Sequence, residues 1–422
     1  ERMGWILGPY EHGAPARFAD GVPDWFGKSL FPGDLDRLVP HVEAAVRRVP
    51  ALDGCGIKDI INGPISYTPD GSPLIGPAWG QRNLWLNEGH SFGITAAGGS
   101  GWQLAEWIVE GEPGIDMLAT DPRRFGPYTS KRYVTKKNEE TYQEVFTIHF
   151  PDEERPAARP AKTSPVYDRL NQLGAVWGQR YGWERANWFA PPGVERKDQW
   201  SFRRSNYFKH VGNECRRMRE QVGIIDLTPF TKHEVSGPGA AAWLDSLVAN
   251  KVPVKAGRIA LCHALTPRGG IRSEFTITRL PNGSFYVVSA GAAERYDADY
   301  LQKRLPTDGS VALSNITSAR GCFVVAGPRS RDVLARLIDA PLDNAAFPWL
   351  SSQVLEVGLA VDVYTLRVNF VGSLGWELHF PIEYAHHLFD ALFEAGAEHG
   401  IGMVGMRAME SMRLEKSYRM WG

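Results

Sequence analysis

Two glycine-containing motifs in the second half of the chain end in a carboxylate. Glu274 closes the sequence GGIRSE at residues 269–274, and Glu377 closes the sequence FVGSLGWE at residues 370–377. A single carboxylate can accept two parallel N–H groups from one edge of a planar ring, as it does from a guanidinium group. A carboxylate beside a reacting nitrogen can also accept its proton. The two glutamates are therefore candidates for ligand binding and for proton transfer.

A third candidate is the glycine-rich stretch GHSFGITAAGGSG at residues 89–101, which leads into a helical pattern. Its backbone N–H groups and the positive end of the helix suit an electron-rich ligand edge. The stretch contains no GxGxxG fingerprint, and close helix packing without a ligand explains its glycines equally well. His90 lies in this stretch, and a loop histidine is more often hydrogen-bonded in place than an acid or base.

The elements around the glycine-rich stretch are typical of an α/β segment. Residues 56–67 are rich in β-forming side chains, the sequence PDG at residues 69–71 predicts a turn, and residues 83–86 predict a short strand. A helix is predicted over residues 101–109. Its apolar residues lie nearly all round the helix, which predicts burial on both sides.

The chain is long enough for more than one domain. Its 422 residues predict two or three domains. Residues 151–165 consist of proline, alanine and charged residues with almost no large apolar side chain, which is typical of a semi-extended linker. We therefore place a domain boundary at this segment.

The sequence beyond the linker shows an internal duplication. The sequence VSGP at residues 235–238 and the sequence VAGP at residues 325–328 each precede an apolar helical pattern. A β-rich run and a second helix follow in each half, at residues 285–289 and 296–305, then at residues 376–380 and 384–397. These repeats predict a pseudo-symmetric α+β domain with helices on antiparallel sheets and a ligand between the halves. Two unrelated strand-and-helix units that share a Gly-Pro turn are the alternative.

The composition excludes several function classes. With 47 basic and 48 acidic residues, the chain has no global field to recruit nucleic acid or an anionic membrane surface, and a small neutral or zwitterionic ligand fits better. The four cysteines lack CxxC spacing, which argues against a structural zinc site or a disulfide framework and favours a reducing compartment. We predict no metal site. The sequence contains no apolar run of about 18 residues, so we predict no membrane span.

Two sets of motifs resemble known families. The sequence TPDGSPLIG at residues 68–76, with the glycine-rich stretch, resembles the closing segment of flavin amine oxidases related to D-amino-acid oxidase. The sequence IDLT at residues 225–228, both glutamate motifs, and RLEKSYRMWG at residues 413–422 together resemble the glycine-cleavage T-protein family. The pairing of these sets, with WER at residues 183–185 and SFRR at residues 201–204, is most similar to the dimethylglycine and sarcosine dehydrogenases.

This resemblance implies an α+β architecture, in which a remnant of a flavin oxidoreductase substrate or cap domain precedes a pseudo-duplicated, aminomethyltransferase-type folate-binding domain. The implied parts are the end of an FAD-dependent oxidoreductase domain at residues 1–150, the linker at residues 151–165, and a folate-binding domain at residues 166–422 that lacks its C-terminal barrel. Both termini look cut. We therefore expect the isolated chain to be inactive and to bind flavin weakly.

The resemblance also implies a site for tetrahydrofolate. Glu377 would accept the N–H groups of the pterin edge, and Glu274 would be the catalytic carboxylate beside the nitrogens that receive the one-carbon unit. Thr276, Phe370 and Tyr418 would line the same pocket.

Three positions depart from the T-protein pattern. Phe370 stands where the family usually has tyrosine, and Glu274 stands where T-proteins generally have aspartate. Met409 replaces an arginine, so the folate tail must find another cation. For Arg413 and Glu415, an ion pair is the favoured interpretation over contact with a ligand.

The implied reaction is FAD-dependent oxidative demethylation of dimethylglycine or sarcosine, with transfer of the one-carbon unit to tetrahydrofolate. Gly93, Ile94 and Thr95 would contact the isoalloxazine ring of FAD. Oxygen or an electron-transfer protein would accept the electrons. The expected location is the cytoplasm, or the mitochondrial matrix in a eukaryote.

Two alternatives remain open on the sequence alone. The first is a folate-binding regulatory module that has lost one-carbon transfer, which the departures at Glu274 and Phe370 allow. The second is an oxidase or dehydrogenase for another secondary or tertiary amine.

Overall fold

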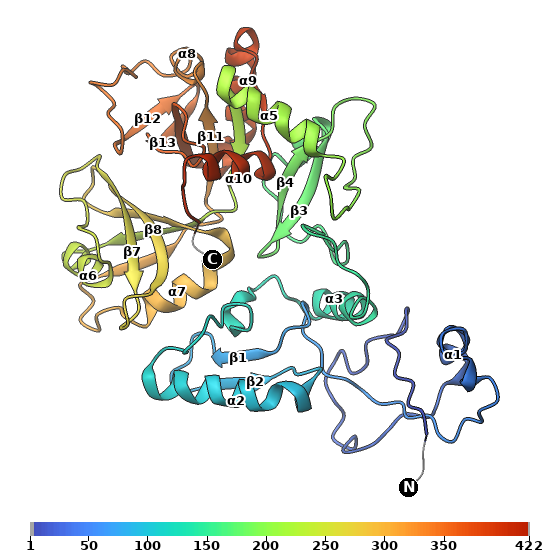
Figure 1. Ribbon diagram of the computed structural model, residues 1–422. Coiled ribbons are helices and arrows are strands. Elements are labelled where there is room, and N and C mark those ends of the chain that lie inside the picture. Colours follow the sequence, from blue (N-terminus) through green and yellow to red (C-terminus); the bar gives the residue numbers. More distant parts are fainter. Residues whose placement is uncertain (1–3, 421–422) are drawn as a thin grey trace. The chain divides into compact units, whose positions relative to one another are not determined.

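Figure 1 shows the fold in a computed structural model of the chain, which describes residues 4–420. The chain forms two compact units. The first comprises Glu1–His149 with Arg155–Arg159, and the second comprises Phe150–Glu154 with Pro160–Gly422. No helix among the described residues is both long enough and apolar enough to cross a membrane.

The segment predicted as a linker is held by hydrogen bonds in each unit. In the first unit, the backbone N–H of Ala157 donates to Oε1 of Glu140 over 2.7 Å. In the second unit, Oε1 of Glu154 lies 3.2 Å from Nη1 of Arg180. The segment is irregular, as its proline content predicts, but it is tied down at several points.

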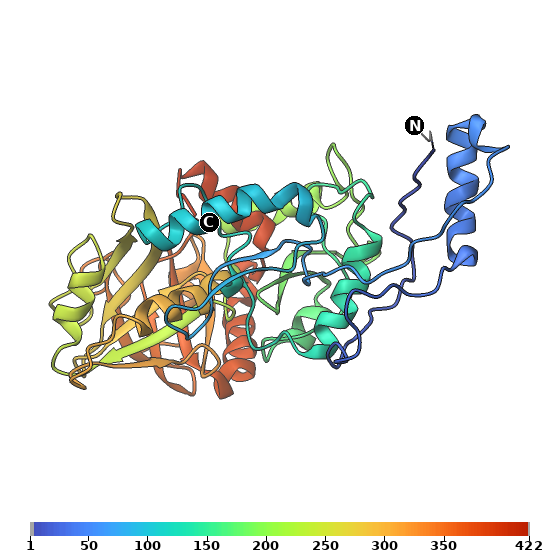
Figure 2. The same cartoon turned by 90° about the horizontal axis from the view of Figure 1, so that it is seen from below.

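The first unit combines a small antiparallel sheet with helices. In chain order its elements are α1 (Leu35–Arg48), a 3-10 helix (Pro50–Leu52), β1 (Leu74–Pro77), β2 (Trp85–Glu88), α2 (Gly93–Glu110), a second 3-10 helix (Pro122–Arg124) and α3 (Lys131–Gln143). β1 and β2 pair with each other, and a small core of Ile75, Trp107 and Met117 packs beside them. Figure 2 shows α1 standing apart from α2.

The strand predicted at residues 56–67 is absent from the first unit. The one β-bridge of this segment joins Asn62 to Phe31, and a lone extended segment without a ladder of backbone bonds is not a stable strand. The turn that follows is confirmed, because the Gly71 N–H donates to the Thr68 carbonyl over 3.1 Å.

The predicted first residue of α2 and its predicted burial on both sides are also wrong. The helix begins at Gly93, so the glycine-rich stretch forms its first turns instead of a loop. Trp107 is buried, but Ile94 and Val109 are 101% and 78% exposed. Ahead of the helix, Nε2 of His90 lies 2.8 Å from Oδ1 of Asn87, which confirms a hydrogen-bonded loop histidine.

The second unit begins with a hairpin and two helices, followed by two large sheets. The elements before the sheets are α4 (Tyr167–Gln172), β3 (Ala175–Arg180), β4 (Trp183–Phe189) and α5 (Phe208–Glu220). The first half then contains β5 (Gly223–Asp226), β6 (Thr231–Ser236), α6 (Ala240–Leu247), β7 (Ile259–Leu265), β8 (Ile271–Arg279), β9 (Phe285–Ser289), a 3-10 helix (Gly291–Ala293) and α7 (Glu294–Gln302).

The second half repeats the order of the first. Its elements are β10 (Ala312–Asn315), β11 (Arg320–Ala326), α8 (Ser330–Leu334), β12 (Ser352–Val357), β13 (Ala360–Leu366), β14 (Gly375–Pro381), a 3-10 helix (Ile382–Tyr384) and α9 (Ala385–Gly396). A last 3-10 helix (Ala397–His399), β15 (Gly402–Met403) and α10 (Met406–Glu415) follow. The strand order β6-β9-β8-β7 in one sheet matches β11-β14-β13-β12 in the other, which confirms the predicted duplication.

The two halves exchange their first strands. β5 precedes β6 in the chain but pairs with β11, and β10 precedes β11 but pairs with β6. The five-stranded sheet therefore has the order β10-β6-β9-β8-β7, and the six-stranded sheet has the order β12-β13-β14-β11-β5-β15. Each half thus supplies a strand that forms backbone hydrogen bonds with the other half's sheet.

The repeated Gly-Pro turns have a structural reason. Gly237 and Gly327 adopt φ angles of +105° and +122°, which disfavour side chains. A Cβ on Gly237 would lie 2.4 Å from the Ser310 carbonyl oxygen, and one on Gly327 would lie 2.4 Å from the Gln221 carbonyl oxygen. These carbonyls lie two residues before the exchanged strands, so the turns allow the close approach that the exchange requires.

The second unit is layered. Side chains from α6 and α7 pack on the outer face of the five-stranded sheet, and side chains from α8 and α9 pack on the outer face of the six-stranded sheet. The inner faces meet through Tyr286 and Val288 of one sheet and Tyr364 and Leu366 of the other. The central strands β9 and β11 are buried along their whole length, which explains their continuous apolar sequences.

His233 is a buried polar residue in the core of the first half. It is 1% exposed, and neither ring nitrogen has a hydrogen-bond partner among residues 4–420. Burial lowers the pKa of His233 to about 4. His233 lies four residues before Gly237, and Phe323 lies four residues before Gly327, so the duplicated half has phenylalanine at the equivalent position.

We expect His233→Phe to reduce the acid sensitivity of folding. Between pH 6.5 and about pH 4 the unfolded chain binds a proton at His233 that the folded chain does not, so stability falls as the pH falls. The loss from this group is about 3 kcal/mol at pH 4. Urea denaturation across this pH range should show a shallower decline in the variant. An identical decline in wild type and variant would contradict the assignment, and His386→Phe, at an exposed site, is the control.

Candidate functional site

Polar side chains line the inner face of the six-stranded sheet. Glu377 and His379 are two residues apart on β14, so both point to the same face. Cys322 of β11 and Tyr364 of β13 pair with His379 from its two sides. Tyr364 packs against Tyr286 of the five-stranded sheet, with ring centroids 5.2 Å apart. This polar group therefore lies between the two sheets.

The hydrogen bonds of His379 define its tautomer. Its Nδ1 lies 2.9 Å from the Tyr286 hydroxyl, and its Nε2 lies 3.1 Å from Oε2 of Glu377. Burial raises the pKa of Tyr286 well above its usual value, so the phenol keeps its proton and donates to Nδ1. Burial lowers the pKa of His379 despite the opposing effect of Glu377, so the neutral ring donates from Nε2. One oxygen of Glu377 is thus held, and the carboxylate retains lone pairs for further donors.

Lys232 is a buried cation close to this group. Its Nζ donates to the carbonyl oxygens of Thr228 and Phe230, each 2.8 Å away. Burial lowers the pKa of Lys232 to about 8, while the nearby carboxyl groups of Asp226 and Glu377 favour its charged form. A positive charge at this position compensates a carboxylate that is itself only 7% exposed.

The predicted motif at residues 225–228 holds strands together. Oδ1 of Asp226 accepts the Thr228 N–H over 2.9 Å, and Oδ2 accepts the Ser164 hydroxyl over 2.6 Å. The Thr228 hydroxyl oxygen accepts the Cys322 N–H over 3.2 Å, which ties the end of β5 to β11. Burial raises the pKa of Asp226. The motif is therefore structural support beneath the polar group.

Cys322, Glu377 and His379 also have the donor types of a metal site, with one ligand atom from each within 4.8 Å of the others. A thiol must lose its proton to bind a metal such as zinc, but burial, with the charge of Glu377, raises the pKa of Cys322 well above its usual value. Lys232 already supplies a positive charge beside these groups. We therefore interpret the three residues as a hydrogen-bonded group that orients Glu377.

Glu274 and Thr276 lie on the opposing sheet. Thr276 of β8 pairs with Val288, which belongs to the core between the sheets, and Glu274 is on the same face of β8. Oε2 of Glu274 lies 3.1 Å from Nε2 of His263 on the edge strand β7, and its side chain is 27% exposed. Glu274 is therefore a strand carboxylate with a histidine partner, on the face that meets the sheet of Glu377.

Phe370 and Tyr418 come together near the end of α10. Their ring centroids are 6.3 Å apart, and the Arg413 guanidinium lies 5.9 Å from the centre of the Phe370 ring. Tyr418 is 37% exposed. Gly372, in the loop that carries Phe370, allows close contact with α10, since a Cβ there would lie 2.4 Å from Cγ of Lys416. The structure thus brings two of the predicted folate contacts into one aromatic pair.

The charged residues of α10 form ion pairs within the protein. Nε of Arg413 lies 2.7 Å from Oε2 of Glu410, and Glu415 pairs with Arg219 of α5. The ion-pair interpretation of Arg413 and Glu415 is confirmed. Met409 is 2% exposed and packs in the core between α5 and the six-stranded sheet, so its position faces the interior.

The residues predicted to contact FAD form the first turn of α2. Gly93, Ile94 and Thr95 follow Phe92, whose side chain provides no cap. The first backbone bond of the helix runs from the Ala96 N–H to the Phe92 carbonyl over 3.1 Å, so the three preceding N–H groups have no acceptor within the helix. This uncapped helix start offers donors to an electron-rich ring edge.

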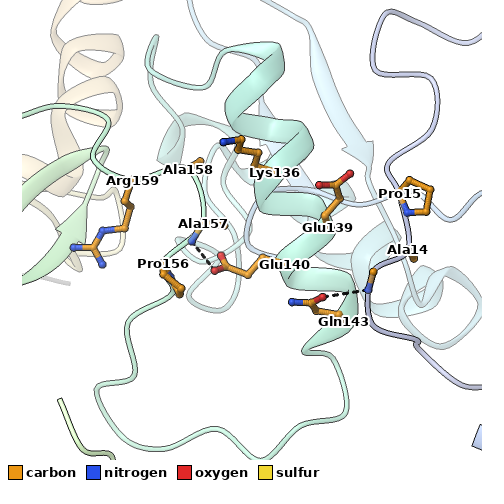
Figure 3. A pocket seen from close by; sticks show the side chains of 11 residues that line it. Ala14, Pro15, Lys136, Glu139, Glu140, Gln143, Pro156, Ala157, Ala158 and Arg159 are labelled. Carbon is orange, nitrogen blue, oxygen red and sulfur yellow. Dashed lines mark hydrogen bonds between the residues drawn. The ribbon is translucent and has the colours of Figure 1, made fainter. Parts of the chain in front are cut away.

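A groove of about 630 Å³ lies beside α3 in the first unit (Figure 3). Its lining residues are Gly13, Ala14, Pro15, Lys136, Glu139, Glu140, Gln143, Pro156, Ala157, Ala158 and Arg159. Glu140 accepts the Ala157 N–H (Figure 3). Oε1 of Gln143 lies 3.5 Å from the Gly13 nitrogen. These side chains tie two extended segments to the helix, so we interpret the groove as structural.

Sequence reasoning missed the residues that surround Glu377. The spacing of Glu377 and His379 was an available signal, because alternate residues of a strand share a face. Tyr286 and Lys232 carried no local signal. They reach the group only because the two sheets pack face to face.

Three family profiles match consecutive parts of the chain. The GCVT N-terminal domain matches residues 166–422, the FAD dependent oxidoreductase central domain matches residues 110–164, and the FAD dependent oxidoreductase domain matches residues 4–107. The first match covers more than half of the chain.

Several curated relatives are similar to the chain over nearly its whole length. Human mitochondrial dimethylglycine dehydrogenase is 38% identical over 100% of this chain and 49% of the relative. The 4-methylaminobutanoate oxidase (formaldehyde-forming) of Paenarthrobacter nicotinovorans is 33% identical over 99% of this chain and 50% of the relative. Mouse mitochondrial sarcosine dehydrogenase is 32% identical over 98% of this chain and 49% of the relative. The chain therefore spans about half the length of these relatives.

Tyr286→Phe should allow both neutral tautomers of His379, because it removes the hydroxyl that donates to Nδ1 and keeps the packing of the aromatic ring. We expect the free energy of unfolding to fall by about 1–3 kcal/mol, because a buried acceptor loses its donor. Nitrogen-15 shifts of the His379 ring should change from those of a single tautomer. Tyr300→Phe, which removes a hydroxyl bonded to the Leu247 carbonyl over 3.3 Å, is the control and should leave these shifts unchanged. Unchanged shifts in Tyr286→Phe would show that the hydroxyl does not hold the ring.

Proposed function

Because this chain belongs to the dimethylglycine and sarcosine dehydrogenase family, with a GCVT N-terminal domain over residues 166–422, we propose that it serves an FAD-dependent demethylation coupled to folate. The substrate is an N-methylated glycine, either dimethylglycine or sarcosine. The one-carbon unit passes to tetrahydrofolate. The second unit binds the folate, and the first unit contributes to the flavin site.

The buried carboxylate of Glu377 is the observation that carries this proposal. The edge of a pterin ring presents a ring N–H and an amino group side by side, and one carboxylate accepts both. Glu377 is held by the His379 N–H, which Tyr286 in turn orients through its hydroxyl. A carboxylate that is already oriented loses less freedom on binding, so this arrangement supports tight and directional recognition of the ring.

Glu274 is the carboxylate that we propose for one-carbon transfer. One folate nitrogen attacks the iminium carbon of the oxidised amine and loses its proton, and a second folate nitrogen then displaces the demethylated amine, which leaves with a proton. If released formaldehyde is attacked instead, water is the group that leaves. Glu274 accepts the proton of the attacking nitrogen, and the His263 ring, 3.1 Å away, stabilises the charge of the carboxylate before transfer. Thr276, Phe370 and Tyr418 line the folate pocket. Binding both reactants in one protein raises their effective concentration.

The backbone N–H donors at the start of α2 suit the electron-rich ring of FAD. When bound, FAD would supply the acceptor for the hydride that leaves the N-methyl carbon of the amine. Gly93, Ile94 and Thr95 present backbone N–H groups that the helix leaves without acceptors, and these groups would stabilise negative charge on an adjacent ring. Ile94 is fully exposed on this turn, where its side chain would pack against the ring face.

A second candidate is the oxidation of a different methylated amine. The similarity to the 4-methylaminobutanoate oxidase favours it, since that relative is 33% identical over 99% of this chain. Product analysis with both amine classes, with and without tetrahydrofolate, separates the two candidates. Oxygen or an electron-transfer protein accepts the electrons in either case. For a eukaryotic source, the mitochondrial relatives support a matrix location.

Glu377→Gln should weaken tetrahydrofolate binding. The amide still accepts the His379 N–H, but it presents one acceptor and one donor group where the pterin edge needs two acceptors. We expect the Kd to rise about 30-fold to 100-fold, which corresponds to about 2–3 kcal/mol. Calorimetric titration of the protein with tetrahydrofolate measures this change. Glu356→Gln, at an exposed position of β12, is the matched control. Wild-type affinity in Glu377→Gln would remove the observation on which the proposal rests.

Glu274→Gln should separate binding from transfer. We expect tetrahydrofolate affinity within about twofold of wild type. Formation of methylenetetrahydrofolate by the full-length protein should fall about 10²-fold to 10⁴-fold, the usual loss of a general base. Unchanged product formation would exclude Glu274 from the chemistry. A full-length wild-type protein that binds folate but forms no product would instead support a folate-binding regulatory module.

A further inference from the structure

Arg185 is a half-buried arginine without a partner among the described residues. It lies on β4, and among residues 4–420 no side chain or carbonyl accepts its N–H groups and no carboxylate forms an ion pair with it. Its Nε atom is buried. Burial lowers the pKa of Arg185 to about 10, and the nearby Arg180 and Arg407 add to this effect. The Nε–H is therefore removed from water without an acceptor, while the side chain as a whole is half-buried.

The acids nearest to Arg185 are engaged by other arginines. Glu154 and Glu410 both favour the charged form of Arg185. However, Glu154 pairs with Arg180 over 3.2 Å, and Glu410 accepts Nε of Arg413 over 2.7 Å. Both carboxylates are thus held in ion pairs with exposed or half-buried partners, and neither approaches Arg185 within 4.0 Å in any described contact.

A second donor without a partner lies on the same face of β4. Trp183 is 5% exposed, and its Nε1 atom has no hydrogen-bond partner among the described residues. Trp183 and Arg185 are alternate residues of the strand, so their side chains leave it in the same direction. The Lys162 ammonium, which pairs with Glu294, lies 4.4 Å from the centre of the Trp183 ring.

Two buried donors without acceptors indicate a missing acceptor. A buried N–H without a partner costs free energy, and an unpaired buried charge costs more, so native proteins rarely retain either without a ligand, ion or water. A planar guanidinium binds a carboxylate through two parallel bonds, and an indole N–H is a donor only. The chemistry of the pair therefore fits a carboxylate ligand.

The position of Arg185 relates this site to the proposed folate pocket. α10 packs against β4, and Glu410, which acts on Arg185, belongs to this helix. One turn further along α10, Arg413 lies over the ring of Phe370, which in turn contacts Tyr418. α10 thus contacts both the aromatic pair, through Arg413, and the strand that carries Arg185.

Resting on the proposed function, we propose that Arg185, with the indole N–H of Trp183, binds a carboxylate of the glutamyl tail of tetrahydrofolate. The carboxylate of the N-methylated amine has the same chemistry and is the other source that an experiment must distinguish. Arg185 is on this view a specificity residue for the glutamylated folate and takes no part in bond making.

The test compares two ligands that differ only in the tail. Wild type, Arg185→Gln and Arg185→Lys are titrated calorimetrically with tetrahydrofolate and with tetrahydropteroate, which has the same ring and benzoyl group but no glutamate. We expect Arg185→Gln to weaken tetrahydrofolate binding about tenfold and to leave tetrahydropteroate binding unchanged. Arg185→Lys should give a smaller loss because it keeps the charge but not the paired geometry. Arg336→Gln, which removes an exposed arginine paired with Glu398, is the control and should bind both ligands like wild type.

Each other outcome has a distinct meaning. Equal weakening of both ligands, or no weakening of either, would overturn the tail assignment. Selective loss of dimethylglycine binding would assign the site to the amine and also overturn it. A wild-type protein that binds neither folate would overturn the proposed function together with this inference. The melting temperature of Arg185→Gln without ligand should equal or exceed that of wild type, because the removed charge has no partner to leave behind.

Discussion

The exchange of strands between the two halves is the constraint on which the interior of the second unit depends. β5 completes the sheet of the second half, and β10 completes the sheet of the first. Without the other half, β6 and β11 would lose the backbone hydrogen bonds that they form with β10 and β5. The exchange therefore holds the inner faces of the two sheets against each other. Polar side chains on these faces are removed from water wherever the sheets meet. The group around Glu377 is buried by this topology and not by its own sequence neighbourhood.

Burial of this group requires compensation within the protein. Lys232 has two carbonyl acceptors, and the neutral ring of His379 connects a phenol donor to a carboxylate acceptor. Each of these side chains therefore has a hydrogen-bond partner within the protein, as a buried polar network requires. By the same requirement, the unpaired Nε–H of Arg185 indicates an acceptor on a bound ligand, because no described residue of the protein provides one.

The first unit shows where local patterns are insufficient. The β-forming residues 56–67 have no neighbouring strand to pair with, and so they remain irregular. The glycines at the start of α2 suggested a loop, but intrinsic helix propensity is a weak preference that adjoining helical residues outweigh. The apolar residues of α2 suggested burial on both sides, yet the helix packs on one side only, through residues such as Trp107.

The sequence by itself determined the features that arise from short segments. The repeated Gly-Pro turns, the apolar strands and the ordered glutamate motifs predicted a duplicated α+β unit with Glu274 and Glu377 as candidate carboxylates, and the fold is confirmed. Only the tertiary structure decided which strands are exchanged, and that Glu377 meets His379, Tyr286 and Lys232. The physical reason is that backbone geometry is local, whereas burial, protonation state and hydrogen-bond partners depend on residues that are distant in sequence and meet only when the sheets pack.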